Sequence, residues 1–195
     1  MNEEQGGSGK RAMDDFSKEL SEKDIKLFVK GRFQEVKKNN KIKELVGFQA
    51  MNKFMIMAHS QEQLQVLGRI VASNKKIKLS EILIEYENHL KLALESNPTI
   101  KTHSNVLLHI FGFFSKEFCA LEKDKFFELL QDYKNEKMTI GAILAEIHPI
   151  VYRFNRTYLA SQTYFLLYAN SEQGNIFKIL EENKIKNILT KKFQI

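Results

Sequence analysis

The sequence contains little of what organises disulfide-stabilised or membrane proteins. Its 195 residues include two prolines, nine glycines, no tryptophan and one cysteine. The single cysteine, Cys119, excludes an internal disulfide framework and any metal or iron–sulfur site built only from cysteines. No apolar run approaches the roughly 18 to 20 residues that cross a bilayer, and the N-terminus lacks a signal peptide's apolar centre. We therefore expect a cytoplasmic protein without membrane contacts.

Positive charge exceeds negative charge, with 30 Lys and Arg against 24 Asp and Glu, a net charge of +6. The basic residues gather at Lys37, Lys38, Lys41 and Lys43, at Lys75, Lys76 and Lys78, at Arg153 and Arg156, and at Lys184, Lys186, Lys191 and Lys192. This balance favours an anionic partner, with nucleic acid ahead of a membrane surface. The alternative is that the lysines only solubilise helices.

Hydrophobic periodicity predicts a helical protein. Residues 1–13 are polar and glycine-rich, which predicts a disordered tail, and their "GGSGK" lacks the spacing of a phosphate-binding loop. We expect one helical domain over residues 14–170 and a basic helical extension over 171–195. The fold class is all-α, a single-domain bundle of about seven to nine helices.

The expected helices follow apolar residues at three- to five-residue intervals. Ile42–Ala58 forms the second helix, Ser60 with Gln63 resembles a capping box for the third, and Ser80 caps the fourth. Another helix runs from about Thr102 to Phe118. Three apolar faces are predicted to be buried: Phe16, Leu20, Ile25, Phe28 and Val29; Met51, Phe54, Met55, Ile56, Leu64, Leu67 and Ile70; and Ile82, Leu83, Tyr86, Leu90 and Leu94.

Polar side chains interrupt two of these helices at helical spacing. On the second helix Gln49, Asn52 and Lys53 share a predicted face, and His59 falls near the same line. A second stripe consists of Thr102, Asn105, His109, Gly112 and Lys116. The glycine suggests close approach of another backbone or of a ligand. Each stripe is either a solvated outer face or the wall of a binding site.

Catalytic templates find no support in the sequence. It contains neither H-E-x-x-H nor G-x-S-x-G, and the five histidines lack metal-binding spacing, although a three-histidine site assembled in space stays open. Cys119 has no nearby histidine to activate it. We therefore predict no cofactor and no metal, and enzymatic activity is not favoured.

Three blocks of the sequence resemble a known family. "KELVGFQAMNKFMIMAHSQEQLQVLGRIVA", "HSNVLLHIFGFFSK" and "YLASQTYF" are similar, in this order, to motifs of the YbgA-type domain of unknown function. The resemblance runs from about Glu22 to Ala169. Lys53, His59, Ser60, Gly68 and Arg69 match the first motif; His103, Asn105, His109 and Gly112 the second; Tyr158, Gln162 and Thr163 the third.

The resemblance implies a role around RNA. Domains of this family often follow a desulfidase domain linked to removal of sulfur from 4-thiouridine in tRNA, and the helical domain is the natural candidate for holding the tRNA. This chain lacks the desulfidase cysteines, so only binding is carried over. Gln49 and Asn52 stand where relatives tend to have histidines, which weakens catalysis more than binding.

Three hypotheses stay open. The first is an RNA-binding module, with tRNA as the expected class and a separate desulfidase-type protein as a partner. Its predicted binding residues are Lys53, His59, Ser60, Arg69, His103, Asn105, His109, Arg153, Arg156, Tyr158 and Gln162. Lysine and arginine would contact phosphate, the histidines with Asn105 would line a polar pocket, and Tyr158 would stack on a base. The second is an enzyme acting on a nucleotide or modified base, and the third is a protein-interaction domain.

Overall fold

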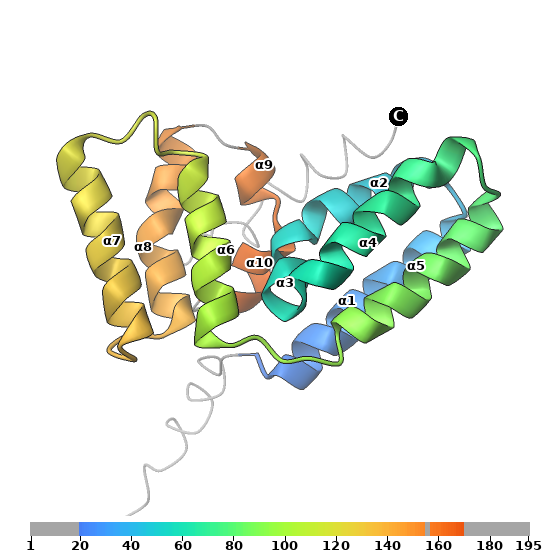
Figure 1. The fold of residues 1–195 in the computed structure, drawn as a ribbon, viewed down its shortest axis with the longest axis horizontal. Coiled ribbons are helices and arrows are strands. Elements are labelled where there is room, and N and C mark those ends of the chain that lie inside the picture. Colours follow the sequence, from blue (N-terminus) through green and yellow to red (C-terminus); the bar gives the residue numbers. More distant parts are fainter. Residues whose placement is uncertain (1–19, 155–156, 170–195) are drawn as a thin grey trace, which may run out of the picture.

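The computed structural model of the chain describes residues 20–154 and 157–169, and within these all regular structure is helical (Figure 1). The α-helices are α1 (Glu22–Asn39), α2 (Ile42–Met51), α3 (Lys53–His59), α4 (Gln61–Ala72), α5 (Leu79–Ala93), α6 (Ile100–Gly112), α7 (Ala120–Lys134), α8 (Ile140–Arg153), α9 (Thr157–Ala160) and α10 (Thr163–Tyr168). A 3-10 turn, Ser73–Lys75, follows α4. The all-α prediction is confirmed. The predicted tail over 1–13, its junction with the domain and the extension over 171–195 lie outside the described residues.

Side-chain caps fix where several helices begin. The Ser21, Ser60 and Thr139 side chains accept hydrogen bonds from backbone N–H groups of α1, α4 and α8. Thr99 and Thr102 form a capping box at α6, so that helix starts at Ile100 and ends at Gly112, both ends earlier than predicted. The predicted cap Ser80 is wrong, because α5 begins at Leu79 after Lys78.

The predicted second helix, Ile42–Ala58, is broken in two. Asn52 leaves helical geometry with φ −99° and ψ 6°, and its Nδ2 donates to the Phe48 carbonyl oxygen at 2.8 Å. That carbonyl oxygen also accepts the Asn52 backbone N–H at 3.0 Å, so the last turn of α2 keeps its helical bond. The Gln162 side chain instead lies between the Phe54 N–H and the Ala50 carbonyl oxygen and bonds both, and α3 starts as a separate helix. Gln49, Asn52, Lys53 and His59 therefore do not share one face, which corrects the sequence prediction.

Helix α3 lies at the centre of the fold and packs on α4, α5, α6 and α10 (Figure 1). Every residue from Phe54 to His59 is buried. Helices α1, α2, α4 and α5 extend to one side of it in the view of Figure 1, and α6, α7 and α8 to the other. The three motif blocks meet here, because α3 and α4 carry the first, α6 the second, and α9 with α10 the third.

Most predicted core residues are buried. The apolar faces in α3, α4 and α5 are confirmed except for Met51, which is half-buried, and Pro149 sits inside α8 without ending it. On α1 the prediction is half wrong. Ile25 and Val29 are buried, and Phe33 and Val36 continue their face, whereas Leu20 and Phe28 are 50% and 42% exposed; Phe16 lies outside the described residues. Across the described residues no helix combines the length and apolar character needed to cross a membrane.

Candidate functional site

Two of the motif histidines lie in the interior, inside a polar cluster that joins α1, α3, α6 and α10. His59 and His103 are 4% and 7% exposed. The His59 Nδ1 atom is 2.7 Å from the Ser96 carbonyl oxygen, and the His103 Nδ1 atom is 2.7 Å from the Tyr164 hydroxyl. The His103 ring also stands edge-on to Tyr168, with centroids 4.9 Å apart. We define the buried cluster as Glu22, His59, His103, Tyr164 and Tyr168.

Hydrogen bonding fixes the protonation of His59. A carbonyl oxygen only accepts, so Nδ1 carries the hydrogen that is donated to Ser96, and the neutral ring presents Nε2 as an acceptor. Burial lowers the pKa of His59 to about 4. Burial also lowers the pKa of His103 to about 4, with a smaller contribution from nearby His59. Both rings are therefore neutral near pH 7.

A carboxyl group and a phenol complete the cluster beside His59. The Tyr168 hydroxyl donates to Glu22 Oε1 at 2.9 Å and lies 3.3 Å from His59 Nε2. Glu22 Oε2 is buried, has no hydrogen-bond partner and is 3.6 Å from His59 Nε2. Burial raises the pKa of Glu22, with the Tyr168 hydrogen bond acting in the opposite direction. At 3.6 Å the Glu22 Oε2 and His59 Nε2 atoms face each other without a direct hydrogen bond.

Gln162 of the third motif is also buried and connects three helices by hydrogen bonds. It is 1% exposed, and its Nε2 donates to the Ala50 carbonyl oxygen at 2.8 Å and to the Tyr158 carbonyl oxygen at 3.4 Å. Its Oε1 accepts from the Phe54 backbone N–H at 3.5 Å. One buried amide thus joins the end of α2, the start of α3 and α9.

An exposed aromatic surface adjoins the buried Gln162, because Tyr158, which bonds Gln162 through its carbonyl oxygen, carries an exposed ring. The Tyr158 ring is 37% exposed and stacks on Phe113, with centroids 5.8 Å apart and planes at 29°. Phe113 meets Phe54 edge-on at 6.1 Å, and the Lys53 Nζ lies 6.0 Å from the Phe54 ring centroid. We call Lys53, Phe113 and Tyr158, together with His109 one turn before Phe113, the aromatic–basic surface.

The remaining first- and second-motif residues lie around this surface or on neighbouring helices. Arg69 is exposed on α4, and His109 is exposed on α6. Ser60 only caps α4, accepting from the Gln63 N–H at 3.2 Å, while the Gln63 side chain pairs with His89. The Asn105 Nδ2 donates to Gln61 Oε1 at 2.8 Å and ties α6 to the start of α4.

The predicted stripe on α6 is confirmed as an outer face. Thr102 and Asn105 are half-buried, His109, Gly112 and Lys116 are exposed, and Val106, Leu107 and Ile110 are buried on the other side. A Cβ atom added at Gly112 would meet nothing within 4 Å. The expected close approach of another backbone to Gly112 is therefore wrong. The space above the glycine is open.

Of the two arginines predicted to bind near the third motif, Arg153 and Arg156, the structure describes only Arg153. Arg153 Nη1 donates to Glu122 Oε1 at 2.5 Å, and its guanidinium lies 4.3 Å from the Phe154 ring centroid. Its charge is thus already paired with a carboxylate whose pKa it lowers. Arg156 lies outside the described residues.

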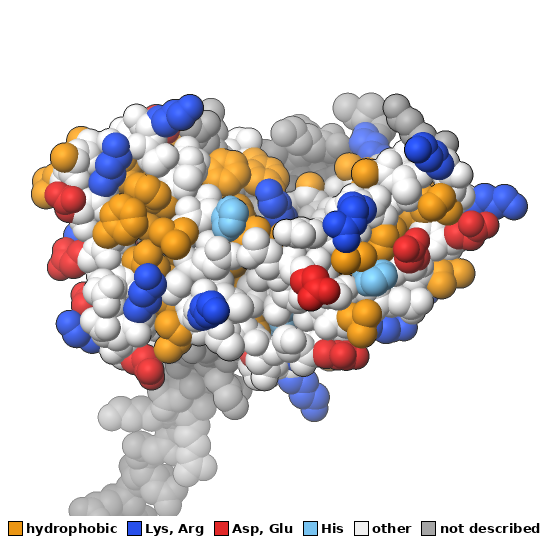
Figure 2. Space-filling view, viewed as in Figure 1, with side chains coloured by type: hydrophobic (Ala, Val, Ile, Leu, Met, Phe, Trp, Pro, Cys, Tyr) orange, Lys and Arg blue, Asp and Glu red, His pale blue; other side chains and the backbone are white. Residues whose placement is uncertain are grey.

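Mixed charges cover the face that carries α4 and α6, with Lys and Arg beside Asp and Glu and apolar side chains gathered over α6 and α7 (Figure 2). Two surface hollows, one on α1 and one between α7 and α8, are lined by none of the predicted binding residues. Within the described part of the chain, no three His, Cys, Asp or Glu side chains are placed to hold a metal ion. The geometry therefore offers buried hydrogen-bonding groups and an exposed aromatic–basic surface.

Sequence reasoning missed Glu22, Tyr164, Tyr168 and Phe113. Tyr164 lies inside the third motif, and Tyr168 follows it by four residues, so helical spacing alone places the two rings on one face. Glu22 carries no such signal, because only the folded chain brings it to His59. Phe113 is half-buried, and an apolar residue next to Gly112 gives no sequence signal that its ring backs Tyr158.

A family model described as a protein of unknown function, DUF1722, matches residues 53–169, from the first residue of α3 to the residue after α10. The chain belongs to this family. It is also similar to the uncharacterized protein YbgA of Escherichia coli (strain K12), with 25% identity over 125 residues, which is 64% of this chain and 74% of that protein. No solved structure matches the chain. The predicted resemblance to a YbgA-like domain is thereby confirmed, and the family match includes both the buried cluster's histidines and the aromatic–basic surface.

Proposed function

We propose that this chain is a non-catalytic RNA-binding module of the cytoplasm, which holds an unpaired stretch of RNA on its aromatic–basic surface. The single observation that carries the proposal is the exposed Tyr158 ring stacked on Phe113, which also contacts the Phe54 ring near Lys53 and follows His109 by one helical turn. An exposed ring backed by a second ring is a rigid platform for a nucleobase, and neighbouring cations bind the phosphates on either side.

Two of the predicted phosphate-binding cations, Lys53 on α3 and Arg69 on α4, are available. Among the described residues neither Lys53 nor Arg69 has a carboxylate partner, whereas Arg32, Lys37, Lys125, Lys137 and Arg153 are all in ion pairs. An unpaired lysine or arginine gains more from a phosphate than one that must first leave a carboxylate. Of the predicted binding residues, Lys53, Arg69, His109 and Tyr158 are thus the ones we assign to RNA. His59, His103 and Gln162 support the surface from within.

The RNA class follows from the family resemblance. Related domains occur beside thiouridine desulfidases, so tRNA is the proposed ligand, and a separately encoded desulfidase-type protein is the proposed partner. In that arrangement this chain supplies RNA affinity and the partner supplies the chemistry.

The test is binding of unmodified tRNA, measured by fluorescence anisotropy at about 50 and about 200 mM salt. We expect a dissociation constant in the micromolar range or tighter at the lower salt, and a steep loss at the higher salt as counterions are released. The double variant Lys53→Ala/Arg69→Ala should bind at least about tenfold more weakly and show a shallower salt dependence. Tyr158→Ala should weaken binding at both salt concentrations, because stacking does not release counterions.

The matched control is Lys30→Ala/Lys134→Ala, which also removes two positive charges, from exposed positions on α1 and α7 that form no ion pair among the described residues. It should bind tRNA nearly as well as the wild type, and circular dichroism should show equal helicity for all variants. Equal loss of binding in both double variants would mean that only net charge matters. Feeble binding by every protein would overturn the proposal.

A second candidate, a protein-interaction domain, is favoured by one observation. The motif residues His59, His103 and Gln162 make hydrogen bonds between helices, as expected if the motifs serve to build a scaffold. This function predicts tRNA affinity that is weak and unaffected by Lys53→Ala/Arg69→Ala. The same experiment therefore separates the two functions.

A further inference from the structure

The buried amide of Gln162 bonds the main chain on both sides of the aromatic–basic surface. Its Nε2 donates to the Tyr158 carbonyl oxygen at 3.4 Å, and its Oε1 accepts from the Phe54 backbone N–H at 3.5 Å. The Tyr158 and Phe54 rings are the two that contact Phe113, with centroids 5.8 Å and 6.1 Å from it. One interior side chain therefore bonds the main chain of both residues whose rings pack on Phe113.

The third hydrogen bond of Gln162 anchors this arrangement at the break between α2 and α3. Its Nε2 donates to the Ala50 carbonyl oxygen at 2.8 Å, the shortest of the three bonds. Ala50 and Phe54 are four residues apart, which is the spacing of a helical hydrogen bond. The amide bonds this carbonyl oxygen and this N–H at the point where the helix is interrupted, so the start of α3 and Tyr158 share one anchor.

Only a carboxamide matches all three partners of Gln162. They are one N–H and two carbonyl oxygens, and a glutamine amide offers one acceptor oxygen and two N–H donors. The side chain is 1% exposed, so water does not replace a lost partner. Burial raises the pKa of the Tyr158 hydroxyl, and a hydrogen bond with the Gln162 side chain acts in the opposite direction. The amide thus lies close to both the main chain and the hydroxyl of Tyr158.

We propose that Gln162 is the positioning residue of the RNA-binding surface, whose amide holds the Tyr158 ring in its stacked place on Phe113 beside Phe54 and Lys53. This role rests on the proposed function, because the position of the ring is felt by a bound nucleobase. A ring that is already held in place loses less conformational freedom when a base stacks on it. Gln162 itself is buried and does not contact the RNA.

The test compares tRNA binding by wild type, Gln162→Leu and Gln162→Glu, measured by fluorescence anisotropy at about 50 mM salt. Both variants keep every cation and every ring of the surface. We expect each to bind about fivefold to tenfold more weakly near pH 8, because part of the stacking of one base is lost. In the Tyr158→Ala background Gln162→Leu should weaken binding less than about twofold, since the ring that it positions is absent.

The glutamate variant supplies a readout that a general loss of stability would not move. A carboxylate has no donor for the Ala50 and Tyr158 carbonyl oxygens, whereas a protonated carboxyl group has one. The affinity of Gln162→Glu, taken relative to wild type, should therefore recover as the pH falls from about 8 to about 6. The same ratio for Gln162→Leu should stay constant.

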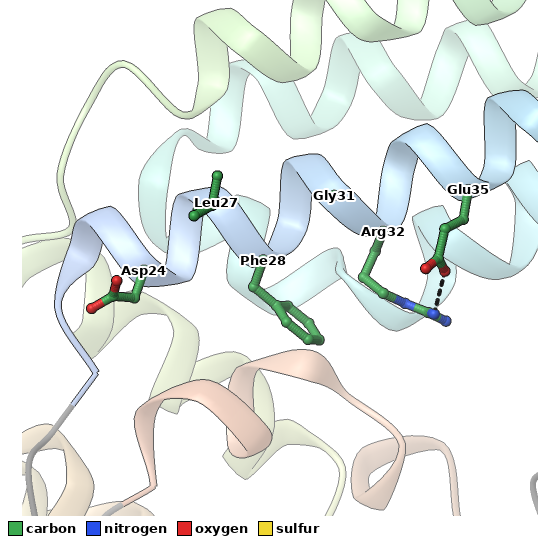
Figure 3. Close-up of a pocket in the computed structure, with 6 residues that line it drawn as sticks. All are labelled: Asp24, Leu27, Phe28, Gly31, Arg32 and Glu35. Carbon is green, nitrogen blue, oxygen red and sulfur yellow. Dashed lines mark hydrogen bonds and ion pairs between the residues drawn. The ribbon is translucent and has the colours of Figure 1, made fainter.

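Two controls separate positioning from stability and from the loss of any exposed ring. Leu130→Ala truncates a buried side chain of α7 away from the surface and should bind tRNA like the wild type. Phe28→Ala removes a ring that projects from α1 (Figure 3) and is 42% exposed, close to the 37% of Tyr158. It should also leave binding unchanged. Circular dichroism and thermal unfolding show whether each variant keeps the fold.

The outcomes distinguish this role from the proposed function. Tight wild-type binding that is equally tight in Gln162→Leu, or that Gln162→Leu weakens equally with and without the Tyr158 ring, overturns the positioning role and leaves the RNA-binding function standing. If Gln162→Leu does not fold, a Gln162→Glu affinity that does not recover toward pH 6 overturns the role as well. Feeble binding by the wild type overturns the proposed function and this role with it.

Discussion

Two histidines six residues apart on α6 have opposite environments. His103 is buried, accepts or donates only within the protein, and has a pKa lowered to about 4. His109 is exposed on the face that also carries Gly112. Six residues turn a helix by about 240°, so one histidine points into the bundle and the other out of it. Two histidines of the second motif thus have different environments: His103 makes a hydrogen bond inside the protein, and His109 faces solvent.

The same division separates the buried cluster from the aromatic–basic surface. The cluster joins four helices through buried polar groups, and the hydrogen bonds of His59, His103 and Tyr168 offset the free-energy cost of removing these groups from water. The surface consists of one lysine, one histidine and two aromatic rings, and its polar groups have few protein partners among the described residues. The difference teaches that in this chain the residues matching the family motifs form an internal frame of hydrogen bonds and, outside it, an exposed face of aromatic and polar side chains.

The largest expected effect that separates the buried cluster from the exposed surface is a loss of folding stability at acidic pH. Unfolded histidine has a pKa near 6.5, whereas folded His59 and His103 have a pKa of about 4, so between these values the unfolded chain binds more protons. Stability is therefore complete above about pH 6.5 and falls as the pH drops toward 4. Between pH 7 and 5 we expect a loss of about 2 kcal/mol per histidine, measured by urea unfolding.

Glu22 acts in the opposite direction. Its folded pKa is raised, so the native chain holds its proton more tightly than the unfolded chain does, and it offsets part of this loss. His109→Ala should leave the pH profile of stability unchanged. Constant stability from pH 7 to 5 in the wild type would show that the buried histidines are not held neutral.

The next largest effect is expected from deleting one member of the cluster. His59→Ala leaves a cavity and a Ser96 carbonyl oxygen without its hydrogen-bond donor, so the free energy of unfolding should fall by about 3 kcal/mol. It should also remove about half of the acid-dependent loss. His109→Ala is the matched control and should change stability by less than about 0.5 kcal/mol. A similar loss of unfolding free energy in both variants would show that His59 contributes no more to stability than the exposed His109.

Much of the fold could be predicted from the sequence because helical periodicity is a local signal. The buried faces of α4 and α5 and the cap at Ser60 follow from residues three or four apart. The break at Asn52 was missed, because an asparagine that bonds the preceding turn looks like any polar residue in a helix. Phe28 was misjudged as core, because periodicity identifies an apolar face and not what covers it.

The candidate site was predicted less well, for a physical reason. Motif matching found His59, His103 and Gln162 but assigned them to a ligand, whereas their side chains bond groups 37 to 112 residues away. Such pairings depend on the tertiary fold. The stripe on α6 was found correctly, because its spacing is that of a single helix.

The smallest expected effect is the change in stability on replacing Gly112, which lies on the exposed side of α6. Gly112 ends α6 on the exposed side, and an added Cβ there meets open space, so Gly112→Ala should raise the free energy of unfolding by about 0.5 to 1 kcal/mol. Gly68, in the middle of α4, should respond alike. Neither glycine is required by packing within the described residues. On the proposed function, Gly112→Gln should keep the stability of the fold and lower tRNA affinity several-fold, measured by anisotropy, because it adds a side chain on the exposed face that also carries His109. Unchanged affinity in Gly112→Gln would place the RNA away from α6.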